Sequence, residues 1–63
     1  MITEEDKEKM ENYRGNDSKM SLYAISIIYD KYNQTNLTAE CWCSRRSRIT
    51  GLTKIFNWYD NNK

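Results

Sequence analysis

The 63-residue chain contains no proline and only two glycines, so little in its backbone interrupts a helix. Apolar residues recur at helical spacing in two long stretches, and no convincing pair of strands competes with them. The sequence therefore predicts an all-α fold. We expect an antiparallel helical hairpin of residues about 18–33 and 38–60, preceded by a polar helix at about 3–14. A chain of this length forms one small domain, residues 1–63.

The first predicted helix has clear ends but a thin apolar face. Thr3 is suited to be its N-cap, three acidic residues follow in the first turn, and Gly15 suits a left-handed C-terminal cap. Only Met10 and Tyr13 share an apolar face. We therefore expect the acidic segment 1–16 to be weakly attached to the hairpin 18–60.

The two hairpin helices carry the predicted core. Asp17 or Ser18 can cap the second helix, and Thr38 can cap the third, with Leu37 and Trp42 at the positions of a hydrophobic staple. Apolar residues then follow a 3-4 spacing along both helices. The predicted core comprises Leu22, Ile25, Ile28, Tyr29, Tyr32, Trp42, Ile49, Leu52, Ile55, Phe56 and Tyr59.

The second helix has more apolar surface than one small interior can bury. Tyr23, Ile27 and Tyr29 widen its apolar face beyond the main stripe. Excess apolar and aromatic surface on a small domain is typical of an interface. We therefore expect these three residues to bind a protein partner.

A cluster of arginines is the second candidate site. Arg45, Arg46 and Arg48 lie within four positions of a chain whose net charge is only +1. Guanidinium groups bind carboxylates and phosphates alike, so this cluster predicts contacts with an acidic protein surface. The alternative is nucleic acid, bound by the three arginines together with Lys54. A nearly neutral chain makes this alternative the weaker one.

Cys41-Trp42-Cys43 is the most conspicuous local motif. Two residues apart on a helix, side chains point to nearly opposite sides, so one helix cannot aim both sulfurs at one metal. The chain has no histidine to complete four zinc ligands. We expect reduced, partly buried cysteines near a helix start and no metal site. A disulfide or a metal shared between chains remains an open alternative.

Several classes of function find no support in the residues. There is no histidine, no phosphate-binding glycine loop and no nucleophile beside a base, which argues against an enzyme and against a cofactor or small-molecule substrate. No apolar run is long enough to span a membrane, and the acidic N-terminus lacks the features of a secretion signal. The expected location is the cytoplasm of the producing cell.

The stretch 22–59 resembles small helical proteins encoded by tailed phages of Bacteroidetes. The resemblance lies in the Tyr-rich residues 29–33, in the run from Cys41 to Ile49, and in Leu52 and Trp58-Tyr59. It implies a phage origin and no known activity. The sequence thus predicts a non-catalytic interaction or assembly component, a minor virion protein that docks on larger proteins or on its own copies. The alternatives are a small nucleic-acid-binding regulator and a phage-encoded inhibitor of a host protein.

Overall fold

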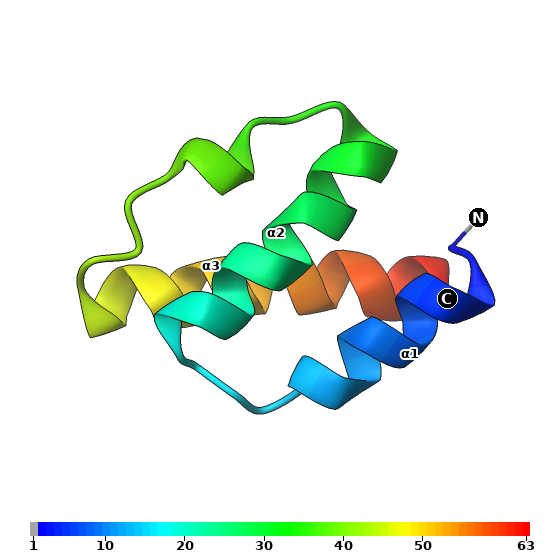
Figure 1. Ribbon diagram of the computed structural model, residues 1–63, viewed down its shortest axis with the longest axis horizontal. Helices are drawn as coiled ribbons and strands as arrows, with labels where there is room; N and C mark the ends of the chain where they lie inside the picture. Colours follow the sequence, from blue (N-terminus) through cyan, green and yellow to red (C-terminus); the bar gives the residue numbers. More distant parts are fainter. Residues whose placement is uncertain (1) are drawn as a thin grey trace.

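A computed structural model describes residues 2–63 and places none of them in a strand. Figure 1 shows three α-helices and one short 3-10 helix: α1 (Glu4–Tyr13), α2 (Lys19–Asn33), η1 (Leu37–Ala39) and α3 (Arg45–Asn62). The predicted all-α class is confirmed. None of the described helices combines the length and apolarity needed to cross a membrane.

The ends of α1 and α2 follow the predicted capping residues. The side chain of Thr3 accepts a hydrogen bond from the Asp6 amide, and that of Ser18 accepts one from the Ser21 amide. Gly15 follows α1 with φ +82°, a left-handed conformation that suits glycine. The sequence therefore predicted both helices nearly to the residue.

The third helix begins later than predicted. It starts at Arg45, because the Ser44 side chain caps it by accepting from the Ser47 amide. The predicted cap, Thr38, instead lies in η1 and is held by Asp30. One Asp30 oxygen accepts from the Leu37 amide at 2.8 Å, and the other accepts from the Thr38 amide and hydroxyl at 2.8 and 2.7 Å. The motif Cys41-Trp42-Cys43 consequently lies outside any helix.

The helices α2 and α3 run in the same direction, so the predicted antiparallel arrangement is wrong. Just before α2 begins, the Asp17 carbonyl accepts a hydrogen bond at 2.9 Å from Nε of Arg48, which lies in the first turn of α3. At their last turns, the rings of Tyr29 and Trp58 meet edge-on with centroids 5.2 Å apart. Residues 34–44, the return segment, lead the chain back along the molecule before α3 begins (Figure 1). Eleven extended residues reach about 36 Å, which exceeds the roughly 22 Å length of α2.

Buried contacts dock α1 on the other helices, in place of the predicted weak attachment. Met10 is fully buried and Asp6 is 5% exposed. Lys31 Nζ donates to Asp6 Oδ2 at 2.7 Å, and the Tyr32 hydroxyl donates to the same oxygen. Burial raises the pKa of Asp6, but these hydrogen bonds outweigh it and the net pKa is lowered. One well-placed methionine and one paired carboxylate thus compensate for the thin apolar stripe.

The predicted core is largely confirmed, with one error and two omissions. Ile49 is 48% exposed, whereas Ile2 and Met10 are buried. The face of α3 that points into the protein carries Arg48, Gly51 and Ile55, because the Trp42 ring packs against Gly51. Ile49 lies on a neighbouring face of the helix and is therefore exposed. The confirmed buried residues are Leu22, Ile25, Ile28, Tyr29, Trp42, Ile55 and Tyr59, with Tyr32, Leu52 and Phe56 partly buried beside them.

Candidate interaction surfaces

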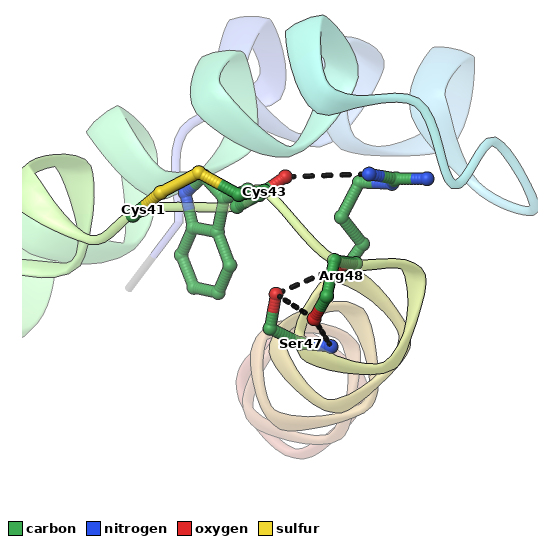
Figure 2. Close-up of a disulfide and its surroundings, with 6 residues drawn as sticks. Cys41, Cys43, Ser47 and Arg48 are labelled. Carbon is green, nitrogen blue, oxygen red and sulfur yellow. Dashed lines mark hydrogen bonds between the residues drawn. A yellow bond between two sulfur atoms is a disulfide. The ribbon is translucent and has the colours of Figure 1, made fainter.

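A disulfide closes the tip of the return segment. It joins Cys41 to Cys43, whose Cα atoms lie 5.4 Å apart, and both residues are exposed (Figure 2). The expectation of reduced cysteines rested on a helix in which the sulfurs would point apart. Because the segment is not helical, both sulfurs lie on one side and can bond. No group of three or more metal-binding side chains occurs within residues 2–63.

Trp42, between the two cysteines, is the anchor of the return segment. Its side chain is 7% exposed, and a Cβ added to Gly51 would lie 2.7 Å from the indole ring. Glycine is therefore needed where α3 meets this ring. Arg48 Nη1 donates to the Trp42 carbonyl at 3.3 Å, which ties the segment to the first turn of α3 (Figure 2). The indole Nε1 finds no hydrogen-bond acceptor in the described chain.

The arginine cluster does not form one surface. Arg48 is partly buried and its guanidinium donates to two backbone carbonyls, so it acts within the fold. Arg45 is exposed, with its Nε 3.6 Å from a carboxylate oxygen of Asp17. Within residues 2–63, the Arg46 side chain has neither an ion-pair partner nor a carbonyl to which it donates, whereas Arg48 donates to two carbonyls and Arg45 lies near Asp17. Of the nucleic-acid candidates, Arg46 and Lys54 remain together, and both line one groove.

This α3 groove, about 450 Å³ in volume, lies between α3 and the return segment. Arg46 and Lys54 lie two helical turns apart on one wall, and Glu40 belongs to the other. No ion pair joins Glu40 to either cation among the described residues. Sequence reasoning missed Glu40 and Trp42 as groove residues, because it placed them on α3 itself. The lining residues are Leu37, Glu40, Trp42, Ser44, Arg46, Ser47, Thr50, Gly51 and Lys54.

The second surface is a row of large apolar side chains on α2, here called the α2 patch: Met20, Tyr23 and Ile27. They are 78%, 51% and 50% exposed. Their i, i+3, i+7 spacing places them on one helix face, a signal visible in the sequence that should have added Met20 to the prediction. A smaller groove of about 290 Å³ adjoins Ile27 between α1 and α2. Tyr29, predicted for the same surface, is instead buried against Trp58.

The polar contacts between α1 and α3 act in packing. The Tyr59 hydroxyl donates to Glu11 Oε2 at 2.7 Å, and Arg14 Nη2 lies 2.6 Å from Asp60 Oδ1. Burial first, and then this bond to Glu11, raise the pKa of Tyr59 to about 12. Arg14 also covers the Phe56 ring, with its Cζ 4.8 Å from the ring centroid. These groups pair with one another within the fold and hold α1 against α3.

The sequence matches no family model, and no curated protein or solved structure gives a significant match. The resemblance to phage proteins therefore stays a prediction, and the geometry of the two surfaces is the basis for assigning a function.

Proposed function

We propose that this protein is a non-catalytic protein-interaction component that docks through the α2 patch. The observation that carries the proposal is the exposure of Met20, Tyr23 and Ile27, each at least half accessible on successive turns of one helix. Contiguous apolar residues of this size on a small domain mark an interaction site. Methionine and tyrosine are also enriched at protein interfaces, where the phenol can hydrogen-bond at the rim.

The geometry favours this function over a nucleic-acid-binding regulator. A nucleic-acid site needs several cations that face one direction and are free to contact phosphates. Arg48 is engaged with backbone carbonyls and Arg45 lies near Asp17, which leaves Arg46 and Lys54. Trp42 packs against Gly51 and is only 7% exposed, so the part of its ring that reaches the groove is too small for a base to stack on.

The narrower proposal is that the partner belongs to a phage particle. It rests on the resemblance of residues 22–59 and on the α2 patch, which would suit a minor subunit seated on a larger protein or on its own copies. Mass spectrometry of purified particles from the source phage tests it. If the protein is absent from the particles but still binds a partner through the α2 patch, the result would point to an inhibitor of a host protein.

Sedimentation velocity across a wide concentration range, with circular dichroism on the same samples, is the first test of the α2 patch. If copies of the chain are the partner, the wild type will self-associate and Ile27→Asn will remain monomeric with unchanged helicity. Thr53→Asn is the matched control, because Thr53 is exposed on α3, away from the patch.

A wild-type monomer at all concentrations would direct the search to a different protein. A photo-crosslinking residue at position 23 should then give a discrete adduct in an extract of the source cells, and Ile27→Asn should abolish it. A crosslinker at position 53 serves as the control. The proposal is wrong if the chain is monomeric and position 23 gives no adduct that depends on Ile27.

A further inference from the structure

We infer that the α3 groove is a second binding site, which takes an acidic peptide segment that carries an apolar side chain. The groove is separate from the α2 patch, since the two share no residue. Its volume of about 450 Å³ lies within the range of sites that enclose small ligands or a few peptide residues. The inference stands whether or not the α2 patch binds a partner.

The charge on the α3 wall selects an anionic ligand. Arg46 and Lys54 are eight residues apart, so two helical turns separate them along the groove. Neither has a carboxylate within 4.0 Å in the described part of the chain. Two cations whose backbone positions lie about 12 Å apart along α3 fit carboxylates on a peptide better than they fit a single small anion.

The floor of the groove favours a ligand that is also apolar. The half-buried Leu37 and the small exposed part of the Trp42 ring form its apolar part, and Gly51 contributes no side chain there. A bound aliphatic or aromatic side chain would cover this surface and displace water from it. The hydroxyls of Ser44, Ser47 and Thr50 line the same groove and are already used in local hydrogen bonds within α3.

Glu40 distinguishes a peptide from a nucleic acid as the occupant. Glu40 lines the groove from the return segment, whereas both cations line it from α3. A continuous phosphate backbone would be repelled by this acid, whereas a polypeptide offers backbone N–H groups to it. The groove therefore has the mixed charge of a protein-binding site.

Titration of the ¹⁵N-labelled protein with the probe peptide acetyl-Glu-Ser-Phe-Ser-Glu-amide tests this inference, because its two carboxylates lie about 13 Å apart on one side of an extended chain. Amide shifts should move in residues 37–54, and the glutamine version of the peptide, which loses both ion pairs, should bind roughly tenfold more weakly. Each of Arg46→Gln and Lys54→Gln should weaken binding about threefold, as exposed ion pairs do. Raising NaCl from about 0.05 to 0.5 M should weaken it further.

Lys19→Gln is the matched control, because Lys19 is exposed at the start of α2 and outside the groove. It should leave the affinity unchanged. Shifts confined to α2, equal binding of both peptides, or no shift at millimolar peptide would each overturn the inference. So would tighter binding of a thymidine oligonucleotide with the same dependence on Arg46 and Lys54, which would assign the groove to nucleic acid.

Discussion

Substituting Gly51 by alanine tests the contact that sets the position of the return segment. In an ordinary helix this change stabilises by about 1 kcal/mol. Here the new Cβ would lie 2.7 and 2.9 Å from two Trp42 ring atoms and 3.3 Å from Leu22 Cδ2, whereas ordinary contacts begin near 3.4 Å. The indole must move by about 0.7 Å, and such overpacking costs about 1–3 kcal/mol. We expect a net loss of about 1 kcal/mol, which lowers Tm by roughly 5 °C.

A double-mutant cycle with Trp42→Leu separates the gain in helix propensity from the cost of overpacking against the indole ring. Leucine lacks the ring atoms that meet the new methyl group, so Gly51→Ala should stabilise the Trp42→Leu protein by about 1 kcal/mol through helix propensity. The sign of the alanine effect should therefore reverse between the two backgrounds. Urea unfolding followed by circular dichroism at 222 nm measures all four proteins. Equal stabilisation by Gly51→Ala in both backgrounds would refute the packing argument.

Three further predictions concern polar contacts. The pKa of Asp30 is lowered to about 2, because hydrogen bonds from the return segment outweigh its burial. The ionised carboxylate therefore contributes its full stability to the fold above about pH 4, and this stability is lost as the pH falls toward 2. In thermal melts, the Tm of Asp30→Asn should fall less on acidification than the Tm of the wild type. The pKa of Tyr59 is raised to about 12, so the free energy of unfolding should fall as the pH rises from 10 to 12. Tyr59→Phe should show a smaller fall over this pH range. At neutral pH it should be about 1 kcal/mol less stable than the wild type, because it lacks the hydrogen bond to Glu11. Absorbance at 295 nm should show one tyrosine ionising late. Arg48→Met removes donors to two backbone carbonyls and should cost about 1–3 kcal/mol in urea unfolding, with Arg48→Lys recovering only part because lysine lacks the guanidinium fork.

Local signals in the sequence predicted α1 and α2 well, because Thr3 and Ser18 cap them through contacts that span three residues. The start of α3 depended on a distant contact. Thr38 has the properties of an N-cap, and so has Ser44, and the choice was made by Asp30, eight residues before Thr38. No local pattern reports which of two good caps a carboxylate elsewhere will engage.

The relative direction of α2 and α3 was not predictable for a similar reason. The return segment is long enough either to form a loose turn or to run back along α2, and both give the same helical periodicity. The structure selects the second arrangement through Arg48 and through the fit of Trp42 against Gly51. That fit also turned Ile49 outward, and it brought Glu40 into the α3 groove.

The shared direction of α2 and α3 also determines how the chain can fold. In an antiparallel hairpin, contacts nearest the turn join residues close in sequence and the rest can zip up from them. Here Asp17 and Arg48 are 31 residues apart in sequence, and nearly the same separation recurs at Leu22 with Gly51 and at Tyr29 with Trp58. Each of these contacts between α2 and α3 therefore closes a loop of about 30 residues. None of them is a short-range contact from which the rest of the α2–α3 interface could form step by step. Docking of α3 becomes an all-or-none step, and the chain should fold more slowly than helical hairpins of its length.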